Sequence, residues 1–306
     1  MGIPGNSHFP NAVSLLLPLS LATLLATAIG FQSGIIRSGT DASVALTAPE
    51  VVTVPARRFT YRAEGEYFRN GYAVDGPMVD VTMRQSLTIM KYQVSSADYA
   101  RCVAEGGCQQ PEPGFPAPVA GEIPATGISQ DDARAYATWL SERTGEVWRL
   151  PSDVELAFAA GSLFPDETLG VGADSENPAL RWLADYERQT SRKASSNPVP
   201  QSYGSFGENE YGLADFGGNV WEWTSSCSHR VTLGKDGEAI DSVASCGIPV
   251  ASGKHRSAMS AFVKNPKSGG CAVGVPPDNL GFRLVKDTRW FAPLVEKLRA
   301  ADLATR

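Results

Sequence analysis

The residues best able to do chemistry lie in one stretch, Asn209-Glu-Tyr-Gly-Leu-Ala-Asp-Phe-Gly-Gly-Asn-Val-Trp-Glu-Trp-Thr224. Its three glycines allow backbone turns that side chains would block, and two carboxylates, Asp215 and Glu222, lie among those turns. Calcium prefers several oxygen ligands from carboxylates and backbone carbonyls. One interpretation is therefore a loop that wraps a hard cation such as calcium.

The other interpretation of this stretch needs no metal. Val220, Trp221, Glu222 and Trp223 alternate as a short strand does, which places both tryptophans on one face and the carboxylate on the other. Large aromatic side chains of this kind are typical of a core. The alternative to a cation site is thus a buried double-tryptophan strand after a glycine turn.

Composition bounds the class of protein. The 306 residues are enough for one large domain with a core, and a hydrophobic content of 42% with 20% charged residues is ordinary for a globular protein. The 30 glycines and 21 prolines favour a loop-rich fold over a helical bundle. The net charge of -6 gives no basic surface for nucleic acid or for an anionic membrane.

The first 31 residues have the character of an export signal. The segment Ala12–Phe31 is almost wholly apolar, and Ala26-Thr-Ala28 has the small-x-small pattern of a cleavage site. Residues 1–31 are therefore predicted to be a signal peptide or an N-terminal membrane anchor, although no basic side chain precedes the apolar run; a misassigned start codon is a third alternative. Residues 32–49 are small and polar, as in a linker.

Periodicity and capping signals predict the elements that position the central stretch. Short alternating runs predict strands at Val51–Val54, Arg58–Tyr61, Val79–Met83 and Glu146–Pro151. Helices are expected from Ala97 to Ala104 after Ser95 or Ser96, from Ser129 to Gly145, and from Ser152 to Gly161. Residues 289–306 are expected to form an amphipathic C-terminal helix.

Further blocks accompany the central stretch in order: Tyr92–Tyr99, Ile128–Leu140, Arg149–Ala160 and Asn279–Arg283. Together the five blocks resemble the formylglycine-generating-enzyme family, also called the sulfatase-modifying-factor domain. Ordered blocks over most of a chain are far more specific than one short motif. The resemblance implies one α+β domain over residues 50–288, with an irregular, loop-rich fold and a C-type-lectin-like core.

The resemblance also implies a calcium site in the central loop. It assigns the ligands to the Asp215 and Glu222 side chains and to the backbone carbonyls of Gly218 and Val220. The family's other calcium loop would begin at Trp182–Asp185, but residues 189–196 contain no carboxylate to complete it. Only the central site is therefore predicted.

Cysteine usage separates this chain from the oxidases of the family, in which a Cys-x-x-x-x-Cys pair ahead of the last block binds copper(I) and activates oxygen. The matching positions fall near Ser260 and Asn265, so no copper is expected. Cys102 and Cys108 are close enough to form a local disulfide, which exported relatives carry, with two free thiols as the alternative. Two of Cys227, Cys246 and Cys271 are expected to pair, which leaves one over.

Two histidines and two arginines are further candidates for a site. The family's iron-dependent sulfoxide synthases use three histidines, but only His229 and His255 follow the leader, so they are surface histidines or, with a carboxylate, a facial triad. Arg149 is expected in an ion pair with a helix carboxylate rather than in a site, and Arg283 against a buried carboxylate or carbonyls.

These observations predict an extracytoplasmic protein, periplasmic or membrane-anchored and facing outward. It is expected to be a non-oxidase accessory or binding module that aids maturation of another exported enzyme or metabolite, with a protein or small molecule as its client. The alternative is a divergent oxidase that acts on a cysteine-containing peptide or small molecule. No Gly-rich phosphate loop and no Gly-x-Ser-x-Gly turn support a nucleotide-dependent enzyme or a hydrolase.

Overall fold

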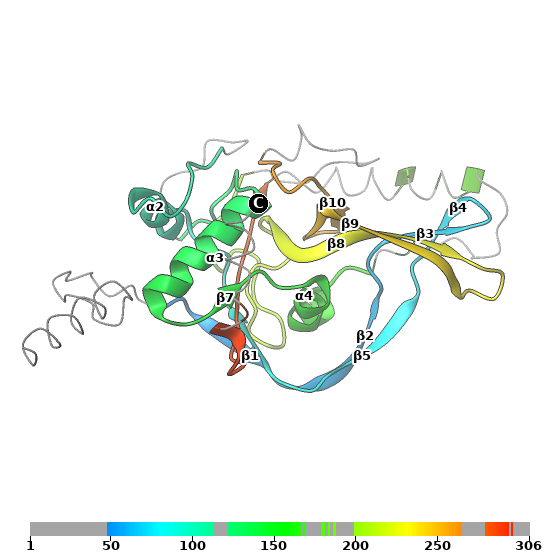
Figure 1. Ribbon diagram of the computed structural model, residues 1–306, viewed down its shortest axis with the longest axis horizontal. Helices are drawn as coiled ribbons and strands as arrows, with labels where there is room; N and C mark the ends of the chain where they lie inside the picture. Colours follow the sequence, from blue (N-terminus) through cyan, green and yellow to red (C-terminus); the bar gives the residue numbers. More distant parts are fainter. Residues whose placement is uncertain are drawn as a thin grey trace, which may run out of the picture. The chain divides into compact units, whose positions relative to one another are not determined.

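Figure 1 shows a computed structural model of the chain. It describes residues 48–112, 122–166, 168, 179–180, 183, 186–187, 199–264, 279–293 and 295. Contacts divide the chain into two units, Met1–Leu46, which lies outside the described residues, and Thr47–Arg306. Every element named below belongs to the second unit.

Several predictions fall outside the described residues: the signal peptide or anchor at 1–31, nearly all of the linker at 32–49, the loop residue Asp185, the positions Asn265 and Cys271, and most of the tail at 289–306. Among the residues that are described, no helix is both long and apolar enough to cross a bilayer.

Two sheets and a two-stranded ribbon make up the β-structure. The first sheet has the order β1-β6-β12-β7, the second has the order β10-β9-β8-β3-β4 with β11 beside β8, and β2 pairs with β5 in the ribbon. Their bounds are β1 Val51–Val54, β2 Arg57–Arg62, β3 Glu66–Arg69, β4 Tyr72–Val74, β5 Met78–Met83, β6 Leu87–Met90, β7 Trp148–Arg149, β8 Trp221–Leu233, β9 Ala239–Ser252, β10 Arg256–Ala258, β11 Leu280–Gly281 and β12 Val285–Lys286.

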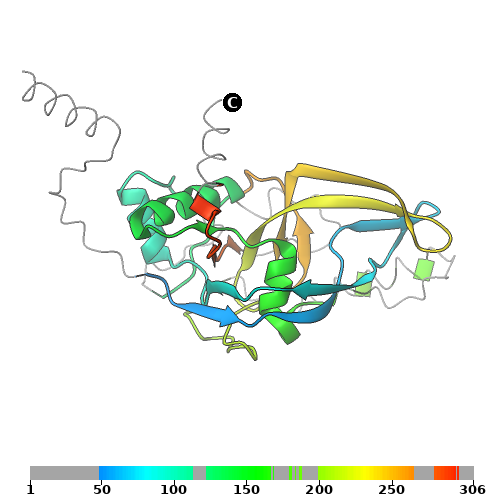
Figure 2. The same ribbon diagram turned by 60° about the horizontal axis from the view of Figure 1, so that its bottom comes forward.

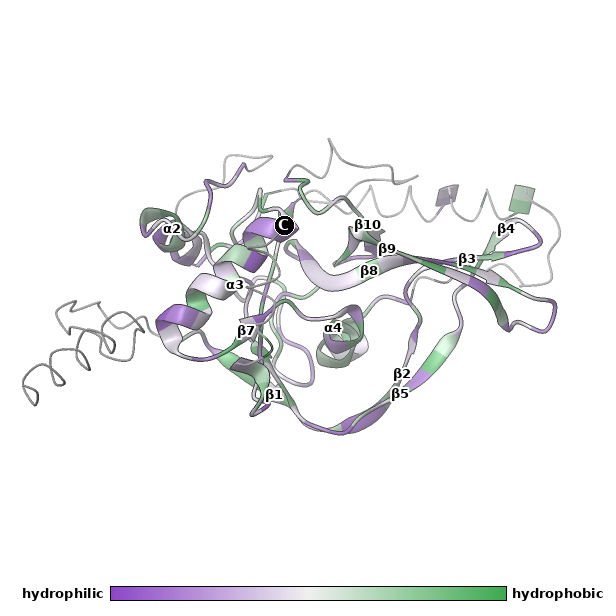
Figure 3. Cartoon of the chain, viewed as in Figure 1, coloured by the Kyte–Doolittle hydropathy of each residue, from purple (hydrophilic) through white to green (hydrophobic). Residues whose placement is uncertain are grey.

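Helices α2, α3 and α4 accompany the sheets in the described part of the chain, and each begins at a predicted serine cap. They are α2 Ser96–Ala104 after Ser95, α3 Gln130–Thr144 after Ser129, and α4 Asp153–Ala160 after Ser152, followed by the short 3-10 turn η1 Gly161–Leu163. Asp132 and Glu155 close capping boxes with their serines, and Gly145 ends α3 at a φ of 71°. Bands of hydrophobic and hydrophilic residues alternate along α3 (Figure 3). The predicted helices are confirmed.

The first sheet packs against α4 to form an apolar core. The fully buried members of this cluster include Val54 from β1, Ile89 from β6 and Phe158 from α4, with Leu213 from the central stretch. Burial of each such side chain stabilises the fold by about 1.5–3 kcal/mol. The irregular, loop-rich α+β fold predicted from the sequence is confirmed.

The strand predicted at the end of the central stretch is longer than expected. It continues as β8 to Leu233 and returns through a Gly234–Gly237 turn as β9, so that β8 and β9 form a long hairpin that extends beyond the helices (Figure 2). Gly237 has a φ of 83°, which a side chain would disfavour. The Asp236-Gly237 pair was the turn signal that would have revealed this hairpin.

The connection between the ribbon strands, residues 64–77, also contains β-structure. It forms the β3–β4 hairpin, whose turn residues Asn70 and Gly71 have φ values of 51° and 80°. Strand β3 then runs parallel to β8, with Glu66 opposite Arg230. The segment, whose strand residues are exposed or partly exposed, thus widens the second sheet.

Arg149 joins α4 to the C-terminal end of the first sheet. Its guanidinium donates to both oxygens of Glu155 at 2.7 and 2.5 Å and to Asp287 at 3.3 Å. The predicted ion pair with a helix carboxylate is confirmed. Burial alone would raise the pKa of Asp287, but hydrogen bonds from Arg289 and the charge of Arg149 more than offset it and lower the pKa to about 2.

The lowered pKa makes Asp287 a source of acid sensitivity. Because the folded-state pKa lies below the unfolded value of about 3.9, its stabilisation is complete above about pH 4 and is lost as the pH falls towards about 2. We expect Asp287→Asn to cost about 1 kcal/mol at neutral pH, a discounted figure because Arg289 is partly exposed, and to flatten the acid limb. Urea midpoints of the wild type and the variant, measured across this pH range, test both effects. If the two proteins lose stability equally as the pH falls, the prediction is wrong.

Candidate functional site

The central stretch meets the last sequence block at the start of β8. Strand β11 lies parallel to β8, with Leu280 opposite Trp221 and Gly281 opposite Glu222. A Cβ atom on Gly281 would lie 2.6 Å from the carbonyl oxygen of Ala125, so only glycine fits at this position. Two segments some 60 residues apart in sequence are thus held in contact.

A buried ion pair lies at this junction. Arg283 donates from Nε to Glu222 Oε2 at 2.6 Å and from Nη2 to Oε1 at 2.7 Å, and both side chains are 0% exposed. The remaining guanidinium donors reach the carbonyl oxygens of Met90, Lys91 and Ala214. The expectation that Arg283 meets a buried carboxylate and carbonyls is confirmed.

Gln93 adds a further hydrogen bond to the Glu222 carboxylate. Its Nε2 donates to Glu222 Oε1 at 2.8 Å and to the carbonyl oxygen of Asp215 at 3.3 Å. Sequence reasoning did not single out Gln93, because nothing in its own block marks it as a partner of residues more than 100 positions away. Its place inside Tyr92–Tyr99 was the one available signal.

Asp215 holds a different part of the loop. It has a φ of 59°, a conformation that aspartate tolerates better than most residues. Its two carboxylate oxygens accept hydrogen bonds from the backbone amides of Gly204 and Phe206 at 2.7 and 2.8 Å. The carboxylate therefore caps the 204–206 turn.

The predicted calcium ligands can be compared with this arrangement. Asp215 and Glu222 are both buried beside the loop, but all four of their carboxylate oxygens already accept protein hydrogen bonds. The charge of Arg283 neutralises Glu222 and disfavours a second cation at the same carboxylate. The arrangement does not favour calcium at Glu222, and the calcium site at Asp215, Gly218, Val220 and Glu222 stays a prediction.

The two tryptophans are buried on the other side of β8. Trp223 is 0% exposed and donates from its indole nitrogen to the carbonyl oxygen of Ile128 at 2.8 Å. Trp221 meets the ring of His255 edge-on, with 4.2 Å between ring centroids. The double-tryptophan strand predicted from alternation is therefore present, with Glu222 buried on the opposite face.

The segment that holds the copper cysteines in the oxidases follows β10. The first of the two expected positions falls near Ser260, and the carbonyl oxygen of the next residue, Ala261, accepts a hydrogen bond from the Gln130 amide at 2.8 Å. Lys264 lies 3.4 Å from Asp132 of the capping box. Hydroxyl and amine groups are hard donors and do not bind copper(I) as thiolates do.

Four of the five cysteines form disulfides. The predicted Cys102–Cys108 bond is confirmed, and Cys227 pairs with Cys246 across the β8–β9 hairpin. This pairing leaves Cys271 as the odd cysteine. Two disulfides are typical of a protein that folds in an oxidising, extracytoplasmic compartment.

The two histidines have separate roles. His229 lies in β8, with Nδ1 3.0 Å from Glu64 Oε2, whereas His255 packs against Trp221. Burial raises the pKa of Glu64, and the hydrogen bond from His229 opposes that rise. Within the described ranges, no group of three histidine, cysteine or acidic side chains could hold a metal, so the facial triad is not assembled there.

The fold and the buried Glu222–Arg283 junction define a loop-rich α+β domain of the sulfatase-modifying type. The family model described as "Sulfatase-modifying factor enzyme 1-like domain" matches residues 38–288, and the chain belongs to this family.

Similar proteins include two mammalian sequences named "Inactive C-alpha-formylglycine-generating enzyme 2". The protein from Bos taurus is 27% identical over 163 residues, which is 53% of this chain and 50% of the relative, and that from Mus musculus is 26% identical, over 53% and 48%. This chain therefore spans about half the length of these relatives. Solved structures that resemble it include PvdO from Pseudomonas aeruginosa, with a TM-score of 0.49, 21% identity and coverage of 82% of this chain and 99% of that one. Treponema denticola variable protein 1 has a TM-score of 0.45 and 15% identity, covering 77% and 94%.

The buried ion pair yields a quantitative test. Glu222→Gln and Arg283→Met each leave one buried charge unpaired, and we expect each to destabilise the domain by about 3–5 kcal/mol. The double variant should be far less destabilised than the sum of the two, because neither charge is then stranded. Urea unfolding measures all three free energies. The half-exposed pair Lys286 and Glu146 is the matched control, with an expected coupling below about 1 kcal/mol. Additive costs at Glu222 and Arg283 would contradict the junction.

Calcium removal tests the remaining prediction for the loop. A calcium ion bound at the predicted ligands, Asp215, Glu222 and the Gly218 and Val220 carbonyls, would stabilise the folded state, since it binds only there. On this prediction, EGTA lowers the melting temperature by about 3 °C or more and added calcium restores it. Melting curves that respond to neither reagent would rule the site out.

Proposed function

We propose that this chain is an extracytoplasmic, non-oxidase member of its family that works as a binding or accessory module. The observation that carries the proposal is the fate of its cysteines. Four are used in disulfides, and the sequence has no cysteine near Ser260 or Asn265, where the resemblance leads us to expect the copper ligands of the family's oxidases. A disulfide sulfur has no thiolate to offer to copper(I) or to a substrate.

The names of two relatives support the proposal of a non-oxidase protein. Two of them carry names that describe an inactive formylglycine-generating enzyme. We extend that description to this chain as part of the proposal, because its own residues lack the thiolate pair. Its client would be another exported enzyme, or a metabolite, whose maturation it assists.

Placement outside the cytoplasm has separate support. Both disulfides join positions close in the fold, Cys102 with Cys108 at the end of α2 and Cys227 with Cys246 in the hairpin. Such bonds persist in oxidising compartments such as the periplasm and are rare in the cytosol. We therefore propose a periplasmic protein or an outward-facing one with a single N-terminal anchor.

The second candidate function is a divergent oxidase, and one observation favours it. Cys271 is left over once the other four cysteines have paired, and a single thiolate is able to engage a substrate cysteine. Such an enzyme would act on a cysteine-containing peptide or small molecule without the family's paired copper ligands.

A peptide assay separates the two functions. We expect no formylglycine from a Cys-x-Pro-x-Arg peptide incubated with the protein, copper and oxygen, followed by mass spectrometry, whereas an active family oxidase in parallel gives turnover. The Cys271→Ala variant is the matched control. Turnover by the wild-type chain that Cys271→Ala abolishes would establish the divergent oxidase and refute the binding module.

A further inference from the structure

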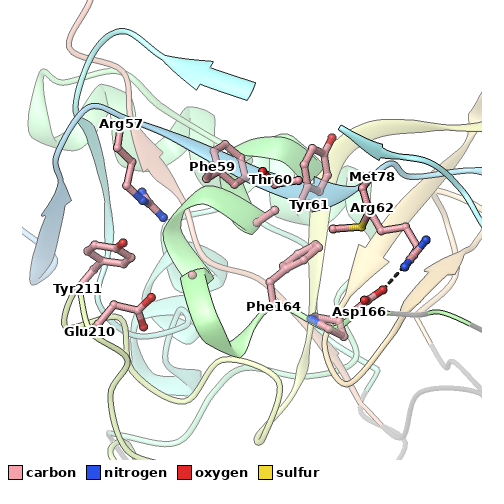
Figure 4. A pocket seen from close by; sticks show the side chains of 13 residues that line it. Arg57, Phe59, Thr60, Tyr61, Arg62, Met78, Phe164, Asp166, Glu210 and Tyr211 are labelled. Atoms are coloured by element: carbon pink, nitrogen blue, oxygen red, sulfur yellow. Dashed lines mark hydrogen bonds and ion pairs between the residues drawn. The ribbon is translucent and has the colours of Figure 1, made fainter. Parts of the chain in front are cut away.

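A pocket of about 280 Å³ lies beside the β2–β5 ribbon. Figure 4 shows its lining side chains, which come from the ribbon, from the end of α4 and the segment after it, and from the turn at Glu210 and Tyr211. None of them belongs to the Glu222–Arg283 junction or to the segment around Ser260. The pocket is therefore a separate feature of the domain.

Arg57 gives this pocket a positive charge. Its guanidinium carbon lies 4.0 Å from the ring centroid of Phe158 and 4.3 Å from that of Tyr211. Nη2 donates to the carbonyl oxygen of Phe158 at 2.7 Å, but Nη1 is buried and has no hydrogen-bond partner in the described part of the chain. A buried charged donor without an acceptor is costly. A bound ligand with an acceptor oxygen could therefore supply what the protein does not offer to this guanidinium.

The acidic side chains of the pocket are already engaged. Glu210 accepts hydrogen bonds from the Ser162 amide at 3.0 Å and hydroxyl at 2.8 Å, and Asp166 pairs with Arg62 at 2.5 Å. Within the described residues, neither carboxylate forms a close ion pair with Arg57. Burial would raise the pKa of Glu210, but its hydrogen bonds and, in smaller part, the charge of Arg57 lower it, so the two charges still interact. An anion that entered the pocket would find the guanidinium held in place by two rings and one carbonyl.

The rest of the lining is largely aromatic. Phe59 and Tyr61 lie on one face of β2 and stack with 5.5 Å between ring centroids, and Phe164 meets Tyr61 edge-on at 6.2 Å. Burial raises the pKa of Tyr61 to about 12, so its hydroxyl is neutral at physiological pH. These rings offer a surface for an apolar or aromatic group next to the charge.

We propose that this pocket binds a carboxylate carried on a small apolar or aromatic body, with Arg57 as the group that pairs with the carboxylate. Arg57 is half-buried at the pocket wall, so part of its guanidinium is open to a ligand, and the aromatic walls around it limit the access of water to such a pair, which strengthens it. A free acid and the C-terminal residue of a peptide share this chemistry. The inference does not depend on the loss of oxidase activity, since its residues lie outside the region of the missing cysteines.

Calorimetric titration of the full chain with N-acetylphenylalanine tests the proposal. The amide of the same compound, which differs only in lacking the charge, is the matched ligand. We expect the acid to bind about tenfold or more tightly than the amide, because hydrogen bonds to charged groups are the stronger ones. Equal affinities for acid and amide, or no binding of the acid, would overturn the proposal.

Variants locate the binding. Arg57→Met keeps the side-chain length but removes the charge, and we expect it to weaken acid binding by about tenfold or more. Arg58→Met is the matched control, because Arg58 is the exposed neighbour on the other face of β2 and should leave binding unchanged. If both variants bind as the wild type does, Arg57 is not the partner.

A second variant keeps the test sound if Arg57→Met fails to fold. Met78→Trp adds bulk at the pocket wall, at a residue that is 51% exposed, and it leaves Arg57 and its contacts intact. We expect it to block acid binding at an unchanged melting temperature. Undiminished acid binding by Met78→Trp would place the ligand elsewhere and refute the pocket.

A peptide comparison separates the two sources of the carboxylate. A pentapeptide that ends in a free phenylalanine carboxylate, compared with its amidated form, shows whether a peptide end binds as the free acid does.

Discussion

The buried ion pair between Glu222 and Arg283 is the interaction on which the rest of the domain depends. Arg283 has donors directed at Glu222 and at carbonyl oxygens of Met90, Lys91 and Ala214, so one guanidinium ties β8 to the end of β6 and to the central loop. A planar donor fork suits this arrangement better than an ammonium group would. Because both charges are fully buried, neither can lose its partner without a large cost in stability. The pair therefore holds the start of β8, in the second sheet, next to the end of β6, in the first sheet.

The junction and the segment in which the family's copper ligands are expected are separate parts of the chain. The residues that hold the junction lie in the blocks around Gln93, Glu222 and Arg283, whereas the copper positions fall in the separate segment after β10. Ser260, near one of those expected positions, is not among the residues of the junction. The interaction that stabilises the fold can therefore be kept whatever residues occupy the segment after β10.

Sequence reasoning succeeded where the determining interaction is local. Ser129 with Asp132 and Ser152 with Glu155 define helix starts within four residues, and the structure has both capping boxes. It also anticipated the partners of Arg149 and Arg283 in kind, because a buried arginine requires acceptors. It did not find Gln93 or the length of the β8–β9 hairpin, since these depend on pairing between distant segments. The pocket of Arg57 could not be predicted either, because its lining comes from three separate stretches of chain. Which two of the last three cysteines pair was open for this reason too.

The pairing of Cys227 with Cys246 has a further consequence for chemistry. Both cysteines lie in the β8–β9 hairpin, where the strand register shifts between Trp223 and Ser228, and the bond joins the two strands across this irregularity. A cross-strand disulfide restricts the unfolded chain and fixes the strands against slippage. Once these sulfurs and those of Cys102 and Cys108 are bonded, only one cysteine remains in the sequence. A two-thiolate copper site needs two sulfurs, so it cannot form while the hairpin is stapled. The bond that stabilises the hairpin therefore also makes two sulfurs unavailable to a metal ion.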